Sequence, residues 1–125
     1  MLFLFILFIL ITNSCDKADY FYVENRTDAL IYYLFSSEYP DTIIPTNRDI
    51  MPIKAHSVHD NVILTSWERN FSKCFPKDTM FIFFFDANTI EKNDWDVVRR
   101  DYMILERRMY SKQDIIKSNW RIVYP

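Results

Sequence analysis

The stretch "MFIFFF", residues 80 to 85, contains no polar side chain and decides how the fold is built. An apolar run that is this short and this aromatic is typical of a strand buried on both faces. Alternation along such a strand puts Ile82 and Phe84 on one face, and on the other Phe81, Phe83 and Phe85. The sequence therefore predicts a central strand here, with apolar groups packed against both of its sides.

Further strands are expected before this run. "YFYVEN" (20–25) alternates around Phe21 and Val23, and "ALIYYLFS" (29–36) is rich in β-branched and aromatic residues. The "NRTD" between them has the composition of a hairpin turn, which predicts that these two strands pair antiparallel. "PIKAHSVHDNVIL" (52–64) alternates only weakly and predicts an edge strand, whereas 65–78 is expected to be an irregular or single-turn connection.

The C-terminal third changes character. Asn93 with Asp96 makes a capping pair ahead of a short amphipathic helix over 94–101, and Ser111 with Asp114 repeats the arrangement ahead of "KQDIIKSN" (112–119). Between the helices, "YMILERRMY" (102–110) returns to a period of two, which favours a strand with one face formed by Met103, Leu105 and Met109.

The final strand is "WRIVYP" (120–125), with Trp120, Ile122 and Tyr124 on its core face. This order of elements predicts a β-rich α+β fold: an antiparallel sheet or sandwich with two short helices in the C-terminal third.

Composition excludes several classes of protein. With 125 residues, 50% apolar and 18% aromatic, the chain can form one packed core and is not a disordered chain. The formal charge of −2 is spread along the sequence, which disfavours nucleic-acid binding because that needs a basic surface. Glycine is absent, which removes the P-loop and the dinucleotide fingerprint and leaves the turns to Asn, Asp and Pro.

The N-terminus has the pattern of an export signal. Residues 1–11 are all apolar, which fits a signal peptide but falls short of the ~20 apolar residues of a membrane-spanning helix. Small polar residues follow, and Ser14-Cys15 resembles the lipobox of bacterial lipoproteins, in which the cysteine is lipidated. We therefore expect a signal peptide over 1–14, a tether over 15–19, and a single β-rich domain over 20–125. The alternative is a secreted protein with a disulfide between Cys15 and Cys74.

The C-terminal part, from residue 78 onward, resembles the ending of a group of small lipoproteins common in Bacteroidota. Their shared pattern includes a Trp-containing helix, a "Y-x-I-L-x-R" strand and a final "N-W-x-I-x-Y-P". It is matched here by Trp95, Tyr102, Ile104, Leu105, Arg107, Tyr110, Ser111, Asp114, Ile115, Asn119, Trp120, Ile122, Tyr124 and Pro125. The resemblance implies an exported lipoprotein of the cell envelope that is anchored by Cys15. Asp16 and Lys17 directly after the anchor resemble the export signals of Bacteroidota lipoproteins, so we expect the outer membrane or the cell surface more than the inner membrane. The resemblance transfers no catalytic residue.

Candidate catalytic and metal-binding residues are few. His56 and His59 are three positions apart, so on a strand they point to opposite faces and do not converge on a metal. Cys74 stands in "KCFP", which matches no nucleophile signature, and a buried thiol is the simpler interpretation. Glu68 beside Trp67 is the acidic and aromatic pair of most interest, but packing of Trp67 over the sheet, with Glu68 paired to a basic neighbour, explains it more simply. The sequence thus predicts no metal, no cofactor and no enzyme active site.

Tyrosines give the best indication of binding. Tyr20 and Tyr22 fall on the strand face opposite Phe21, and with Tyr32 they are candidates for an exposed aromatic surface. The alternative is that these rings cover a second face of the sandwich. Thr42 and Thr79 each lie in an Asp-Thr-aliphatic or Asp-Thr-Met pattern, which resembles the O-glycosylation pattern of exported Bacteroidota proteins.

These features favour a non-enzymatic binding or envelope-accessory module, held at a membrane through its lipidated N-terminus, with a protein or glycan of the envelope as partner. A small envelope enzyme or enzyme inhibitor is the alternative. An enzyme should show a cleft with convergent polar groups, whereas a binding module should show an exposed aromatic patch.

Overall fold

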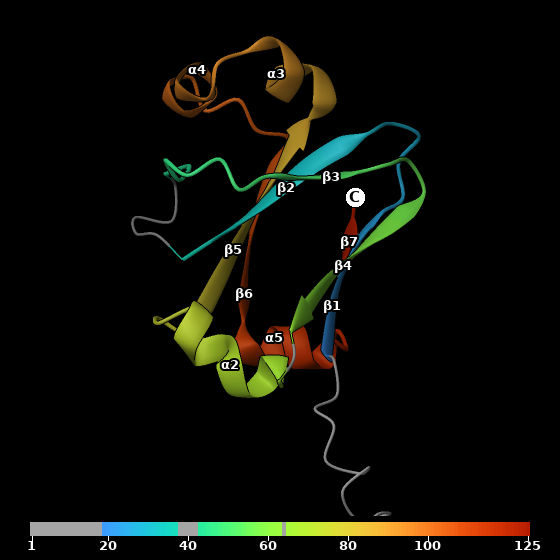
Figure 1. The fold of residues 1–125 in the computed structure, drawn as a ribbon, viewed down its shortest axis with the longest axis vertical. Coiled ribbons are helices and arrows are strands. Elements are labelled where there is room, and N and C mark those ends of the chain that lie inside the picture. Colours follow the sequence, from blue (N-terminus) through green and yellow to red (C-terminus); the bar gives the residue numbers. More distant parts are fainter. Residues whose placement is uncertain (1–18, 38–42, 64) are drawn as a thin grey trace, which may run out of the picture.

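The protein is a strand-rich α+β fold in which two sheets pack face to face (Figure 1). The computed structural model describes residues 19–37, 43–63 and 65–125. One sheet has the order β4-β1-β7, formed by β1 (Asp19–Asn25), β4 (Ser57–Ile63) and β7 (Arg121–Tyr124). The other has the order β3-β2-β5-β6, formed by β2 (Ile31–Ser36), β3 (Met51–Ile53), β5 (Thr79–Asp86) and β6 (Glu106–Ser111). Neighbouring strands are antiparallel, except that β7 runs parallel to β1.

The prediction for residues 80–85 is confirmed, because β5 lies inside its sheet and is buried on both faces. Ile82 and Phe84 belong to the core between the two sheets, where they meet Phe21, Val23 and Ile122 of the other sheet. The opposite face of β5 contributes Phe81, Phe83 and Phe85 to a second core, which also holds Leu34, Ile44, Ile90 and Val98. Two layers of apolar side chains are therefore built on one strand.

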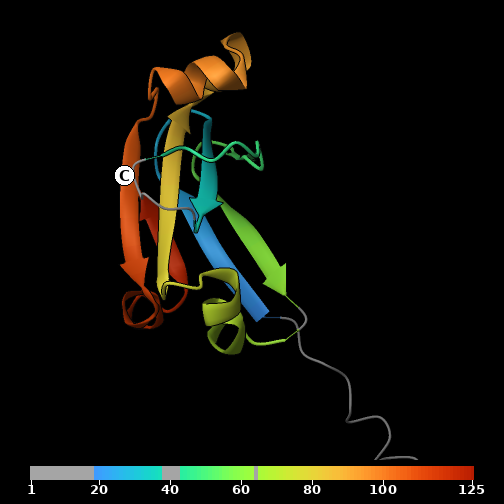
Figure 2. The ribbon, with the colours of Figure 1, turned by 90° about the vertical axis from the view of Figure 1, so that its left-hand side faces the viewer.

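The described part of the chain has four short helices, which lie at the two ends of the sheets (Figures 1 and 2). The second core is completed by α3 (Ala87–Lys92) and α4 (Trp95–Arg100), while α2 (Trp67–Cys74) and α5 (Lys112–Lys117) lie at the opposite end. The two helices predicted from the sequence, α4 and α5, are confirmed, and the capping box of Ser111 and Asp114 is present.

The other two helices were not predicted. The segment 65–78 contains α2, which Ser66 caps by accepting a hydrogen bond from the Arg69 N–H. Asp86 is both the last residue of β5 and the N-cap of α3. The strand therefore passes into the helix without a loop, and no run of turn residues in the sequence marks where the helix begins. The predicted cap of α4 is also wrong: its N-cap is Asp94, and the Asn93 amide instead donates to the Thr89 carbonyl at the end of α3.

The predicted hairpin of the first two strands is wrong, since β1 and β2 belong to different sheets. β1 pairs with β4 over its whole length: Asp19 is opposite Ile63 at one end, and Asn25 is opposite Ser57 at the other. β2 lies between β3 and β5. The fully buried Asn25 amide donates to the Ala29 and Ile53 carbonyls at 2.8 and 3.0 Å, which fixes the chain where it leaves one sheet for the other. β2 is apolar on both faces, and only a position inside the larger sheet buries both.

The strand predicted over 102–110 begins only at Glu106, because Tyr102 takes a left-handed conformation with φ 51°. Of the three residues predicted to form an apolar face, Met103 is partly buried against the second core, whereas Leu105 and Met109 are exposed to solvent. The core side of β6 carries Arg108 instead. Its guanidinium lies 5.3 Å from the Phe84 ring centre and donates to the Val123 carbonyl of β7 at 2.7 Å, which joins the two sheets on this side.

Left-handed backbone conformations occur without glycine. Positive φ angles of 51° to 58° are found at His56, Asp78, Tyr102, Asn119 and Trp120. Asp and Asn were expected at such positions, but the aromatic residues are costly there because Cβ crowds the following carbonyl. Packing compensates at Trp120, which lies against the core between the sheets. Among the described residues, no helix has the length and apolar character needed to cross a membrane.

Candidate functional site

Exposed valines and tyrosine rings lie together on the outer face of the three-stranded sheet. Alternation along β1 turns Tyr20 and Tyr22 outward while Phe21 and Val23 enter the core. Tyr20 stands opposite Val62 of β4 in the strand register, and the two side chains are 41% and 55% exposed. These residues, together with Val58, Tyr22 and Arg121, form what we call the outer strip.

The two tyrosine rings of the outer strip stack on each other, and a guanidinium lies over one of them. The Tyr20 and Tyr22 rings lie parallel, with an interplanar angle of 11° and centres 5.9 Å apart. The Arg121 guanidinium lies 5.3 Å from the Tyr22 ring centre and donates to the Glu24 carboxylate at 3.1 Å. Arg26 donates to the same carboxylate at 2.7 Å. The strip therefore combines ordered aromatic rings, exposed valines and an ion-pair network.

Tyr32 does not join this surface. It lies in the other sheet, packs against the second core and donates its hydroxyl to Glu91 of α3 at 3.3 Å. The three tyrosines predicted as one binding surface are thus divided between two sheets, because β1 and β2 do not form a hairpin. The contribution of β4 could not be predicted from the sequence, because the alternation that turns Val58 and Val62 outward is weak.

A polar cluster joins the two sheets in the core between them. The Tyr33 hydroxyl accepts a hydrogen bond from the Asn61 amide at 2.9 Å and lies 2.5 Å from Nδ1 of His59, to which it is placed to donate. Burial, the largest cause, and the charge of Asp60 raise the pKa of Tyr33 to about 12. Tyr33 is almost fully buried, so this cluster holds the sheets together from within.

The raised pKa of Tyr33 predicts a loss of stability at high pH. The folded state favours the neutral phenol, so its contribution is complete below pH 10 and is lost as the pH rises from 10 to about 12. A rise of about two pKa units corresponds to ~2 to 3 kcal/mol of unfolding free energy. Denaturant unfolding measured across this range should show the decline, and Tyr33→Phe should flatten it. An equal slope in the two proteins would contradict the assignment.

His56 and His59 do not converge. His59 faces the core, whereas His56 lies in the turn before β4 with Nε2 2.6 Å from the Asp28 carboxylate. Within the described ranges no group of three His, Cys, Asp or Glu side chains is placed to hold a metal ion.

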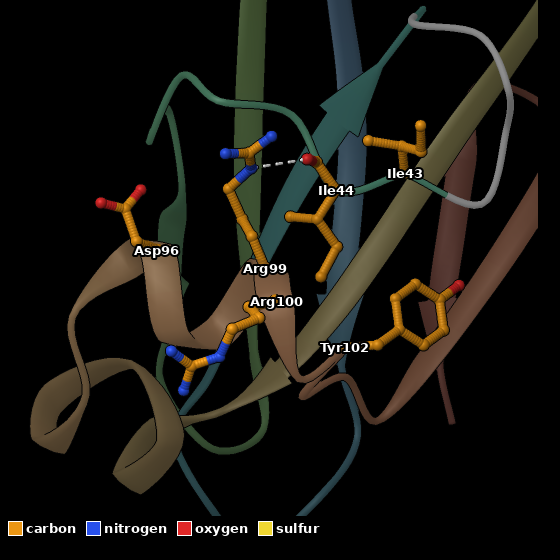
Figure 3. A pocket seen from close by; sticks show the side chains of 6 residues that line it. All are labelled: Ile43, Ile44, Asp96, Arg99, Arg100 and Tyr102. Carbon is orange, nitrogen blue, oxygen red and sulfur yellow. Dashed lines mark hydrogen bonds between the residues drawn. The ribbon is translucent and has the colours of Figure 1, made fainter.

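A hollow of about 390 Å³ lies beside α4 (Figure 3). The Arg99 side chain in it donates from Nε to the Ile44 carbonyl at 2.9 Å, and the Trp95 indole nearby donates to the Pro45 and Thr46 carbonyls. Arg100 pairs with Asp101 and its guanidinium points away from Tyr102. The polar groups of the hollow therefore hold the segment 43–46 against α4 and do not converge on a shared point.

The remaining candidates occupy separate places. Cys74 is exposed, so the expectation of a buried thiol is wrong: α2 ends at this residue, and the core contact passes to Phe75. Trp67 packs edge-on against Phe21 at 5.8 Å, as predicted, and Glu68 is exposed. Thr79 begins β5 and donates to the Lys77 carbonyl. Cys15 and Thr42 lie outside the described residues.

Comparison with known proteins gives no match, neither to a family model nor to a curated protein nor to a solved structure. The outer strip, defined by the chain's own residues, is therefore the candidate site.

Proposed function

We propose that this protein is an exported lipoprotein of the cell envelope that acts by binding another protein through the outer strip. The observation that carries the binding role is the exposed group formed by Tyr20, Val58 and Val62 on the open face of a sheet. Tyr and Arg are enriched in protein interfaces, and here Tyr22 and Arg121 lie together. The apolar residues 1–11 and Ser14-Cys15 support export and lipidation.

A lipid anchor at Cys15 would set the orientation of the domain. Cys15 precedes the first residue of β1 by four positions, a span of at most ~14 Å of extended chain. The Asp19 carboxylate accepts a hydrogen bond from the Trp67 N–H at 2.8 Å, which holds the start of β1 beside α2. The end of the molecule with α2 and α5, where β1 begins (Figure 1), would then face the membrane. The outer strip, which lies along β1 and β4, would stand to the side and be open to a neighbouring protein.

Site-specific photocrosslinking in intact cells tests this function. A benzophenone side chain placed at Val62 should form adducts with a protein, and one placed at Met109 should not. Met109 is a matched control because it is 59% exposed against 55% for Val62 and lies on the other sheet. Adducts of equal yield at the two positions, or adducts at Val62 that consist of glycan, would contradict the proposal.

A further inference from the structure

The described strands leave four sheet edges, of β3, β4, β6 and β7. A free edge offers unpaired backbone groups, and proteins protect it with proline, charge or short length. β3 has three residues with Pro52 in the middle, and β6 begins with three charged residues, Glu106, Arg107 and Arg108. β7 has four residues, and its Val123 carbonyl accepts a hydrogen bond from Arg108. Each of these three edges is therefore protected.

The edge of β4 is different. β4 is seven residues long, contains no proline, and has Asp60 as its one charged side chain apart from a histidine. Its outward side chains are Val58, Asp60 and Val62, so a carboxylate stands between two exposed valines. The edge is long enough, and apolar enough, to pair with another strand.

Hydrogen bonds of β1 show which backbone groups of β4 are free. The Tyr22 N–H donates to the Trp120 carbonyl at 2.9 Å, so Tyr22 and the other even-numbered residues of β1 turn their backbone groups toward β7. The odd-numbered residues of β1 consequently face β4, where Phe21 is opposite Asn61. The odd-numbered residues of β4 complete these pairs. The N–H and C=O groups that point away from the sheet are then those of Val58, Asp60 and Val62.

We propose that the free edge of β4 accepts an extended segment of the partner protein as an added strand, with a Lys or Arg of that segment facing Asp60. This inference rests on the proposed function, because Val58 and Val62 also belong to the outer strip. In strand addition, backbone hydrogen bonds supply affinity and alternate side chains supply specificity. Directly opposite side chains lie about 5 Å apart, so a basic residue pairs with Asp60 and apolar residues on either side meet the valines.

A second copy of this chain fits the edge less well. The symmetric antiparallel pairing that would set Val58 of each copy against Val62 of the other also brings the two Asp60 carboxylates face to face. Like charges in directly opposite positions destabilise a strand pair. Asp60 therefore favours a basic partner segment and opposes self-pairing.

Peptide binding tests the charge selectivity. The full chain in detergent micelles is titrated with fluorescein-labelled Thr-Val-Thr-Lys-Thr-Val-Thr and with the same peptide carrying Glu at the central position. We expect about fivefold tighter binding of the Lys peptide, as cross-strand charge pairs of this kind provide. Asp60→Lys should reverse the preference. Equal affinities for both peptides, or an unchanged preference in Asp60→Lys, would overturn the inference.

A backbone variant tests the edge itself. Val62→Pro removes an N–H that points away from β1, so the fold should survive while peptide affinity falls; Val62→Thr is the control that keeps the N–H. Hydrogen exchange should show peptide-dependent protection at Val58, Asp60 and Val62. Protection on β6 or β7, unchanged binding by Val62→Pro, or self-association through β4 would each overturn the inference. Crosslinks at Val62 without Lys selectivity would refute the strand addition alone, whereas no crosslinks there would refute the proposed function.

Discussion

Phe84→Ala is expected to lower the free energy of unfolding by about 3 to 5 kcal/mol, as replacing a buried phenylalanine by alanine does. Phe84 is fully buried in the core between the sheets. Its ring stacks on Tyr124 with centres 4.5 Å apart and an interplanar angle of 30°. The substitution therefore removes contacts between β5 and β7 and leaves a cavity. Since small domains have only ~5 to 15 kcal/mol of stability, the variant should be close to unfolding.

The substitution should also weaken the packing of Arg108, because its guanidinium lies over both the Phe84 and Tyr124 rings. Glu106, which binds it through hydrogen bonds of 2.8 and 3.1 Å, raises the pKa of Arg108, so its charge is kept and must stay paired. Removal of the Phe84 ring leaves the Arg108 guanidinium with only the Tyr124 ring of these two beside it.

Denaturant unfolding followed by tryptophan fluorescence measures the effect. Met109→Ala is the control, because Met109 is exposed on the neighbouring strand and should change the unfolding free energy by less than ~0.5 kcal/mol. A loss below ~1 kcal/mol for Phe84→Ala would show that β5 is not the strand on which the two cores are built.

The role of β5 could be predicted because its burial is encoded in adjacent residues. Six consecutive apolar side chains at 80–85 leave no solvent-facing position, so both faces must be covered. The capping box of α5 could be predicted for the same reason, because its two residues, Ser111 and Asp114, are only three positions apart in the sequence. Features set by neighbours in the sequence were therefore predictable.

Pairing between distant strands was not. "NRTD" has turn residues, yet the Asn25 side chain binds the Ile53 carbonyl, 28 positions away, and directs β2 into the other sheet. Nothing near Asn25 in the sequence signals that contact. The same applies to the candidate site, since Tyr20 and Tyr22 could be placed on one face by alternation, whereas Val62 reaches them only through the register of β1 with β4.

Cys15→Ala is expected to abolish lipid attachment completely. Cells grown with an alkyne fatty acid should yield labelled wild-type protein and an unlabelled Cys15→Ala variant. Cys74→Ala is the matched control and should keep its label, because Cys74 is an exposed residue of the folded domain and not part of the lipobox-like sequence.

The strength of membrane anchoring depends on the length and the number of the acyl chains. Each buried methylene contributes ~0.8 kcal/mol, and a single chain gives only reversible membrane binding, so stable attachment needs more than one chain. In the proposed orientation Asp19 and α2 would lie nearest the bilayer, and the Cys15→Ala variant would have no acyl group there to insert. Label that persists in Cys15→Ala would contradict the assignment of the anchor.

Lipidation of Cys15 is decided by the mass of the N-terminal peptide, recovered from protein extracted from the envelope. We expect a peptide that begins at Cys15 and carries several acyl chains, which mild base removes in part because some are ester-linked. An unmodified Cys15, a peptide that retains residues 1–14, or a disulfide between Cys15 and Cys74 would contradict this expectation.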